Sequence, residues 1–335
     1  MTIKDIARES GYAIGTVSRV LNNHPDVSDK ARETIMAVVE KYNFKLNNNA
    51  KHLKQQSSNG LAIIVKGSQN MLFASIVEHM QGMIRERGFA CLIYYIGEME
   101  NEVEQALRVV VERRPRGILF LGSNLSFFKE SFAAIQIPCI LVTNSAESLG
   151  FANLSSVSTD DSEAAFAAVE HLLELGHTNV GILGGFLEKS RAAITRYDGC
   201  RRAFEKHGIP FDADIQHESA LFSISDGYEA MGRLLDKMPN LTAIFAMSDT
   251  IALGAIRAIR DRGLRVPEDV SVVGFDGIEL GNYLTPKLTT ICQDRESIAK
   301  QSVELMLANI LDEQKKAVFK TVPFRIIEGE SARKR

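Results

Sequence analysis

The sequence predicts a small, all-α amino-terminal head followed by an α/β body of two doubly wound, parallel-sheet subdomains. Three observations support this fold class. Residues 1–58 carry only helix-type spacing of apolar residues, short apolar runs alternate with amphipathic stretches from Leu61 onward, and these alternations form two successive series. Apolar runs that alternate with helices are typical of parallel sheets covered by helices on both faces.

The composition is that of a globular protein with more than one core. The chain has 335 residues, of which 45% are hydrophobic and 24% are charged. No apolar run reaches the roughly 18 residues of a membrane helix, and we see no signal-peptide pattern at the amino terminus. The four cysteines are scattered without disulfide-like or C-x-x-C spacing. We therefore expect a cytoplasmic protein.

Charge is unevenly distributed along the chain. Residues 1–58 hold nine Lys and Arg against six Asp and Glu, whereas the remainder holds thirty against thirty-six. A cationic head on an anionic body favours a polyanionic partner, although a chance imbalance of a few charges explains the same numbers.

Residues 1–42 predict three short helices. Thr2 caps the first, with Asp5 in the reciprocal capping position. A break at Gly11 leads into a second helix, and two short helices around a Gly-containing turn have the form of a helix-turn-helix. A third helix runs from about Asp29 to Tyr42.

The second helix, in the stretch GYAIGTVSRVLNN, has two different sides. Its core side carries Val17, Val20 and Leu21, and its opposite side carries Ile14, Gly15, Ser18, Arg19 and Asn22. The sequence alone leaves two interpretations of the opposite side. Either Ile14 packs under the third helix and Arg19 is a solvated charge, or the whole side contacts a partner.

Residues 47–60 predict one short helix and a flexible linker. Asn47 is a suitable N-cap for a helix that contains Ala50 and Leu53, and the residues after it have a linker composition. A helix of about seven residues is marginal in water, so something else has to order it.

The body then predicts two series of strands and helices. The first has strands at LAIIV, ACLIYYI, GILFL and CILV and helices near 73–87, 99–113 and 127–135. The second has strands at VGIL, near 214–222, at AIFA and at VSVVGF, and helices near 161–175, 190–207, 225–237 and 249–262. LTTI, a helix near 294–312 and FKTVPF return to complete both sheets. Ligands bind beyond the carboxyl ends of such strands, so two facing subdomains form a cleft.

Motifs along the whole chain resemble one protein family. TIKDIARESGYAIGTVSRVLNN and VSDKARETIMAVVEKYNFKLNNNAKHLK resemble the head of the lac repressor/galactose repressor (LacI/GalR) family of bacterial transcription factors. The body resembles the family in EHLLELGH, RYDGCRRAF, AIFAMSDTIALGAIRAI, VPEDVSVVGFD and PKLTTICQD. The resemblance implies a homodimeric repressor with a periplasmic-binding-protein-like body, whose cleft takes a small effector, often a sugar or nucleobase-like metabolite.

The resemblance also implies a set of DNA-contacting residues. They are Ile14, Gly15, Thr16, Ser18, Arg19 and Asn22 on the second helix, and Asn47, Ala50 and Leu53 on a hinge helix whose Leu wedges into the minor groove. The chemistry fits, because Arg pairs with guanine, Gly permits close approach and Ile contacts a thymine methyl group. The alternative for Leu53 is a side chain packed on the body.

Two positions depart from the family pattern. Ala13 stands where a Ser usually caps the recognition helix, which costs about 1 kcal/mol of helix stability. Leu46 replaces the Pro that usually precedes the hinge helix, so the hinge is less preorganised.

For the effector, the resemblance implies contacts from Arg196, Ser248, Asp249, Asp276 and Gln293, and Phe73 near the first strand is a candidate for stacking on a ring. Arg and carboxylates suit a polyol, because they donate to and accept from neighbouring oxygens. Simpler structural roles stay open. Phe73 also suits a core, Asp249 a helix cap, and Arg196 with Asp276 an ion pair between subdomains.

The sequence argues against an enzyme. It contains neither a phosphate-binding glycine motif, nor H-E-x-x-H, nor a G-x-S-x-G nucleophile motif. We expect no catalytic residues, no cofactor and no metal. Two non-enzymatic interpretations compete with a sugar-controlled repressor: a cytoplasmic sugar-binding protein, and a regulator with a vestigial cleft that a protein partner controls.

These inferences give the expected organisation. The head spans 1–46, the hinge and linker 47–60, and the effector-binding and dimerisation domain 61–335. Its N-subdomain comprises about 61–158 and 291–318, and its C-subdomain about 159–288 and 319–330. Only ARKR follows VPFRIIEGES, too little for a tetramerising heptad helix. We therefore expect a homodimer that binds operator DNA and a sugar-like effector, with no membrane partner.

Overall fold

The computed structural model describes residues 3–21, 26–42, 59–67, 70–187, 190–311 and 316–335. The chain divides into two compact units, Met1–Gln56 and Ser57–Arg335. In the described ranges, no helix combines the length and the apolar character that a membrane crossing requires.

The first unit is a three-helix domain. It comprises α1 (Ile3–Ser10), α2 (Ile14–Leu21) and α3 (Asp29–Lys41), as the sequence predicts. Ile6, Val17, Val20 and Ile35 are buried together in its core. At the start of α2, the Thr16 and Val17 N–H groups donate to the Ala13 carbonyl oxygen, so the backbone alone begins this helix. Thr2, the predicted cap of α1, lies outside the described residues.

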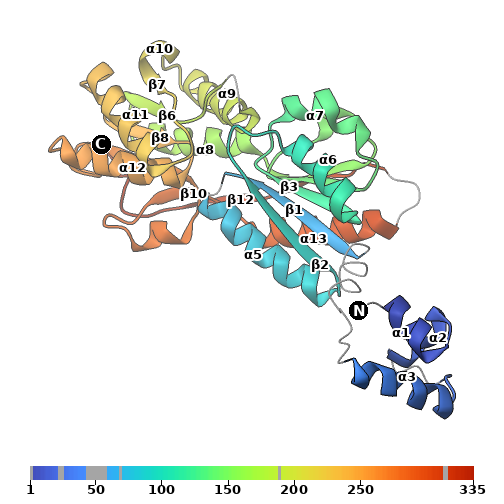
Figure 1. Cartoon of the computed structure of the whole chain (residues 1–335). Coiled ribbons are helices and arrows are strands. Elements are labelled where there is room, and N and C mark those ends of the chain that lie inside the picture. The colour runs from blue at the N-terminus through green and yellow to red at the C-terminus, as the bar shows by residue number, and fades with distance from the viewer. Residues whose placement is uncertain (1–2, 22–25, 43–58, 68–69, 188–189, 312–315) are drawn as a thin grey trace. The chain divides into compact units, whose positions relative to one another are not determined.

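The second unit contains two six-stranded sheets (Figure 1). The first has the order β11-β5-β4-β3-β1-β2, with all neighbours parallel. Its strands are β1 (Gly60–Lys66), β2 (Ala90–Ile96), β3 (Gly117–Leu121), β4 (Cys139–Val142), β5 (Leu154–Thr159) and β11 (Phe319–Val322). The second has the order β12-β10-β9-β8-β6-β7, with only β10 and β12 antiparallel. Its strands are β6 (Val180–Leu183), β7 (His217–Glu218), β8 (Ala243–Ala246), β9 (Ser271–Asp276), β10 (Thr289–Gln293) and β12 (Phe324–Ile327).

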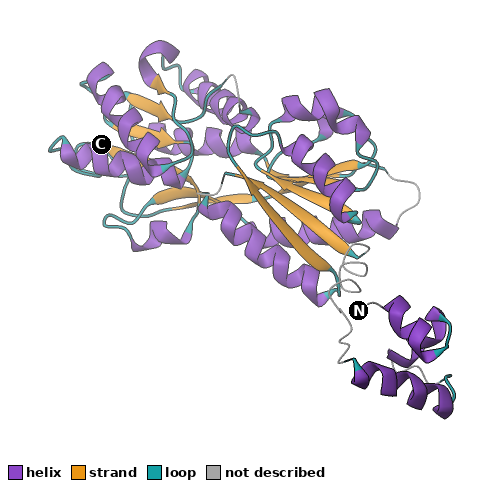
Figure 2. Ribbon diagram, in the orientation of Figure 1, coloured by secondary structure: helices purple, strands orange, loops and turns teal. Residues whose placement is uncertain are grey.

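Helices cover both faces of each sheet, as the apolar strands require (Figure 2). On the first sheet, one core contains α5 (Met71–Glu86) and α13 (Arg295–Leu311), and the other contains α6 (Glu102–Arg113) and α7 (Leu125–Ser131). On the second, one core contains α8 (Asp161–Glu174) and α9 (Arg191–Lys206), and the other contains α11 (Ile224–Lys237) and α12 (Asp249–Asp261). The doubly wound body is therefore confirmed.

Two regions differ from the sequence-based expectation. The strand expected near 214–222 is a short helix, α10 (Ala213–Gln216), followed by the two-residue β7. β5, with the sequence LSSVST, is a fully buried strand that the apolar pattern did not reveal. The short 3₁₀ helices η1 (Phe132–Ala134), η2 (Glu147–Leu149) and η3 (Glu279–Tyr283) complete the architecture.

The chain passes between the two sheets slightly later than expected. β10 extends to Gln293 and pairs with β9 in the second sheet, whereas β11 pairs with β5 in the first. The chain therefore leaves the second sheet after Gln293, where we expected this change near 291. It returns to the second sheet at Pro323, where we expected the change near 319. Which sheet accepts a strand depends on pairing with distant residues, and local apolar spacing does not encode that choice.

Candidate functional site

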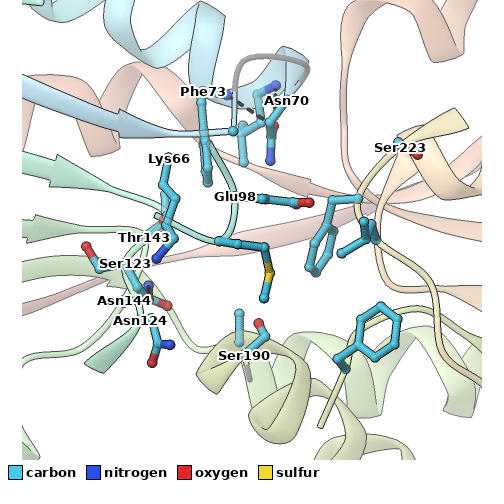
Figure 3. A pocket seen from close by; sticks show the side chains of 18 of the residues that line it. Lys66, Asn70, Phe73, Glu98, Ser123, Asn124, Thr143, Asn144, Ser190 and Ser223 are labelled. Atoms are coloured by element: carbon cyan, nitrogen blue, oxygen red, sulfur yellow. Dashed lines mark hydrogen bonds between the residues drawn. The ribbon is translucent and has the colours of Figure 1, made fainter. Parts of the chain in front are cut away.

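A cavity of about 630 Å³ lies where strands of both sheets end. Its wall includes the last residue of β1, Lys66, and the residues two positions after the ends of β2, β3 and β4, namely Glu98, Ser123 and Asn144. Figure 3 shows Lys66, Ser123, Thr143 and Asn144 gathered on one side and Ser223 on the opposite side. The topology thus brings both sheets' carboxyl ends to one site, where α/β proteins bind ligands.

Arg196 of α9 anchors the wall on the second sheet. It is buried, and its Nε donates to Asp161 Oδ1 at 2.9 Å. A further guanidinium nitrogen donates to the Met247 carbonyl oxygen, and the group stacks 3.7 Å from the Phe275 ring centre. Burial raises the pKa of Asp161, and the positive charge of Arg196 opposes that rise. These contacts hold the guanidinium in one orientation at the cavity wall.

Asp276, at the end of β9, is a buried carboxyl on the same wall. Gln293 Nε2 donates to its Oδ1 at 2.9 Å. Burial raises the pKa of Asp276 to about 7, although Arg196 opposes the shift. Its φ of 119° is an unusual backbone conformation for a residue other than glycine. Such strain is concentrated at ligand-binding sites, and Asp276 lines the cavity.

A buried ion pair supports the wall on the first sheet, where Lys66 lines the cavity and Glu102 is its partner. Lys66 Nζ lies 2.7 Å from Glu102 Oε2, and the two side chains are only 6% and 2% exposed. The other carboxylate oxygen of Glu102 accepts from the Asn124 N–H at 2.5 Å. The Lys66 ammonium also lies 4.7 Å from the Phe127 ring centre. The pair therefore fixes a cation and two strand-end loops at the cavity.

The remaining wall combines aromatic faces with small polar groups. Four phenylalanines line the cavity, from helices and loops beside both sheets: Phe73, Phe127, Phe186 and Phe222. Asn144 Nδ2 donates to the Ser123 carbonyl oxygen at 3.0 Å. Within the described part of the chain, the buried Ser123 hydroxyl has no hydrogen-bond partner. Aromatic faces and a few oriented polar groups suit a small ligand with an apolar face and several hydroxyl groups.

The second candidate surface is the outer side of α2. Ile14 is 47% exposed, and Gly15 and Arg19 are exposed as well. No atom lies within 4 Å of a Cβ built on Gly15, so packing within the described residues does not require glycine there. Arg19 reaches Asp26 at 3.3 Å, with both side chains more than half exposed. This surface can meet a partner without rearranging the core.

Comparison with known proteins identifies the family of the chain. Residues 2–47 match the model for bacterial regulatory proteins of the lacI family, and 169–332 match that for a periplasmic binding protein-like domain. The chain is 36% identical over 319 residues to the HTH-type transcriptional regulator MalR of Clostridium butyricum, covering 92% of this chain and 93% of that one. The chain belongs to the lacI family.

Solved structures of lacI-family proteins share its fold. The lac repressor dimer bound to operator and the anti-inducer ONPF matches with a TM-score of 0.75 at 25% identity, over 99% of each chain. A complex of the transcriptional regulator CelR with cellobiose matches with a TM-score of 0.71, also at 25% identity and 99% of each chain. The relatives are transcriptional regulators and not enzymes.

The structure brings four of the six predicted effector residues of this lacI-family regulator to the cavity wall: Phe73, Arg196, Asp276 and Gln293. It does not place Ser248 and Asp249 there. Ser248 caps α12, accepting from the Ile251 N–H at 3.1 Å. Asp249 is fully buried and accepts from the Ile278 N–H and the Thr290 hydroxyl. Internal partners therefore occupy both side chains.

Among the predicted DNA contacts, five lie on α2: Ile14, Gly15, Thr16, Ser18 and Arg19. Four lie outside the described residues: Asn22, Asn47, Ala50 and Leu53. A direct role of all nine in DNA binding stays a prediction.

Sequence reasoning missed the first-sheet wall. Lys66, Glu102, Asn124 and Phe127 were not singled out, because their partners lie far away in the chain. One signal was available. Lys66 ends the apolar run LAIIVK, and a charged residue at the carboxyl end of a buried strand points toward the edge where ligands bind.

Proposed function

We propose that this lacI-family chain is a cytoplasmic repressor that binds a pseudo-palindromic operator as a homodimer. The outer side of α2 carries the operator-reading residues. Arg19 pairs with a guanine, Ile14 contacts a thymine methyl group, and Gly15 leaves room for the base edges. Thr16, Ser18 and Asn22 contact phosphates or base edges. One small head neutralises too few phosphates for tight binding, so two heads act together.

We also propose that Asn47, Ala50 and Leu53 belong to a hinge helix that folds only on DNA. Two hinge helices of a dimer insert paired Leu53 side chains into the minor groove, which kinks the duplex by unstacking one base step. Because a short helix is marginal alone, small changes in the spacing of the two hinges alter its folding.

The proposed effector is a sugar or sugar derivative bound in the cavity. The single observation that supports this most strongly is the combination of phenylalanines beside both sheets with the Arg196–Asp276–Gln293 cluster. The ring faces pack on the apolar faces of a sugar, while Arg196 donates to its oxygens and Asp276 accepts from its hydroxyl groups. The CelR–cellobiose complex supports this class of ligand.

An effector that contacts both walls favours one arrangement of the two sheets over others. Binding then shifts the population toward that arrangement, which changes the spacing of the two hinges. A coupling free energy of about 1–3 kcal/mol between effector and operator is enough for regulation. The structure supports this scheme through the two-sided wall of the cavity.

The test is selection of bound duplexes from random DNA by the full-length protein, with and without a panel of mono- and disaccharides. We expect one enriched palindrome whose recovery changes with a sugar that also raises the melting temperature. Lack of preference among DNA sequences at physiological salt contradicts the proposed function. Operator binding without stabilisation by any metabolite instead favours control by a protein partner. Sedimentation tests the dimer, which a stable tetramer contradicts.

A further inference from the structure

Five arginines surround the point where the chain enters the body. β1 begins at Gly60, and its neighbours β2 and β3 run parallel to it, so the amino ends of all three strands share one edge. The Ala90 N–H donates to the Asn59 carbonyl oxygen, and the Arg116 N–H donates to the Gly60 carbonyl oxygen. The loops leading into β2 and β3 therefore hold the chain on both sides as it arrives from the head.

Arginines gather in these loops and in the helix ends that lead into them. The loop before β2 follows the end of α5, and the loop before β3 follows the end of α6. Arg85 and Arg113 lie in the last turns of the two helices, and Arg87, Arg114 and Arg116 lie in the loops. We call these five exposed residues the arginine collar. The Arg116 guanidinium lies 5.8 Å from the Phe89 ring centre, which connects the two loops across β1.

The collar is a local excess of positive charge. Within 85–87 and 112–116, only Glu86 and Glu112 oppose the five arginines. Among the described residues, none of the five forms an ion pair, whereas exposed arginines of the second sheet's helices do so, as in Arg257–Asp261 and Arg262–Asp236. The body as a whole has an excess of acidic residues. A cationic surface on an anionic body indicates a polyanionic partner.

We propose that the arginine collar binds operator phosphates next to the hinge, independently of base sequence. This inference rests on the proposed function. If Leu53 enters the minor groove, the six residues from Leu53 to Asn59 span at most about 20 Å. Arginine side chains extend further toward the duplex, and exposed charges interact over a Debye length of about 8–10 Å. DNA is favoured over a phosphoprotein because the chain itself delivers this edge to the operator.

The experiment is the salt dependence of binding by full-length protein, measured on the selected operator and on a mixed-sequence duplex between about 50 and 200 mM salt. The variant is Arg87→Gln/Arg113→Gln/Arg114→Gln. Each lost phosphate contact reduces the log–log salt slope by about 0.9. We expect the slope to become shallower by at least about one on both duplexes, and affinity at low salt to fall about tenfold or more.

Two further variants make the result specific. Arg87→Lys/Arg113→Lys/Arg114→Lys keeps the charges and restores most of the slope, since lysine also binds phosphates as a point charge. Arg201→Gln/Lys300→Gln/Lys334→Gln removes three exposed cations away from the strand edge of β1 to β3 and leaves the slope unchanged. Unchanged melting temperature and sugar response show that each variant is folded.

A glutamine variant with the wild-type slope and affinity overturns the proposal and leaves the collar to a different partner, such as a phosphoprotein. That outcome is distinct from failure of the proposed function, in which the wild-type protein itself prefers no DNA sequence.

Discussion

Replacing Lys66 by methionine tests the buried ion pair of the cavity wall. Methionine keeps most of the side-chain volume and removes the charge that faces Glu102 at 2.7 Å. Glu102 is then left buried with the Asn124 N–H as its main partner. Breaking a buried pair by removing one partner costs about 3–5 kcal/mol. We expect Lys66→Met to lower the free energy of unfolding by that amount.

A double-mutant cycle separates the cost of the unpaired charge from the cost of altered packing. Lys66→Met/Glu102→Gln removes both charges, while the amide oxygen of the introduced glutamine still accepts from the Asn124 N–H. We expect the double variant to cost only about 1–2 kcal/mol, because neither charge remains unpaired and replacement of a whole buried pair is often close to neutral. Urea unfolding of the body, followed by circular dichroism, gives the four free energies at pH 7.

Acidic pH supplies an independent check on the same reasoning. Burial raises the pKa of Glu102, and Lys66 opposes that rise. Without Lys66 the carboxyl group binds a proton more readily in the folded state than in the unfolded state, so folding is favoured as the pH falls. The cost of Lys66→Met therefore shrinks between pH 7 and pH 5. If the two single-variant costs simply add in the double variant, or if the pH has no effect, the argument from an unpaired charge is refuted.

Three further predictions address the two candidate sites and the core. Arg19→Ala reduces discrimination between the selected operator and single-base variants about 10–100-fold, measured by competition binding, and unchanged discrimination contradicts its role. Because the pKa of Asp276 is about 7, a sugar that needs the ionised carboxylate binds roughly tenfold more weakly at pH 6 than at pH 8. Calorimetry at several pH values checks this, and the sugar affinity of Asp276→Asn is expected not to depend on pH. If the affinity of that variant still changes with pH, Asp276 is not the cause. Gly254→Ala puts a Cβ 2.0 Å from the Ile224 carbonyl oxygen and lowers the free energy of unfolding by about 1–3 kcal/mol. Gly232→Ala, in α11 with only an arginine nitrogen at 3.9 Å, is its control and should be stabilising by up to about 1 kcal/mol through helix propensity alone. Equal changes in both variants contradict the packing argument.

Most strands were predictable because they are continuously apolar, and β5 was not because it is rich in hydroxyl groups. A buried hydroxyl usually needs a partner, and for Ser155 the partners come from remote segments. The Ser155 hydroxyl oxygen accepts from Asn309 Nδ2 and from the Val318 N–H. This burial of Ser155 therefore depends on α13 and on the chain leading into β11. No local pattern carries that information.

The effector wall on the second sheet was more predictable than the wall on the first. Family motifs pointed to Arg196, Asp276 and Gln293, and all three line the cavity. The same reasoning placed Ser248 and Asp249 with them, since a helix start and a ligand-binding loop share the same residue types. The structure distinguishes a helix-start role from a ligand-binding role by the partners of the side chains. Ser248 and Asp249 both accept hydrogen bonds from groups within the protein.

The two strands that close the sheets, β11 and β12, meet at the exposed Pro323, and this has a mechanical consequence. Any other residue type at that joint would have an amide hydrogen. Its hydrogen bond would have to break and form again whenever the angle between the two sheets changed. Proline has no amide hydrogen, so a change in the angle between the two sheets breaks no hydrogen bond donated at this joint. Pro323→Ala introduces an amide hydrogen there, and the free energy of such a change then depends on the acceptors that this hydrogen finds before and after it.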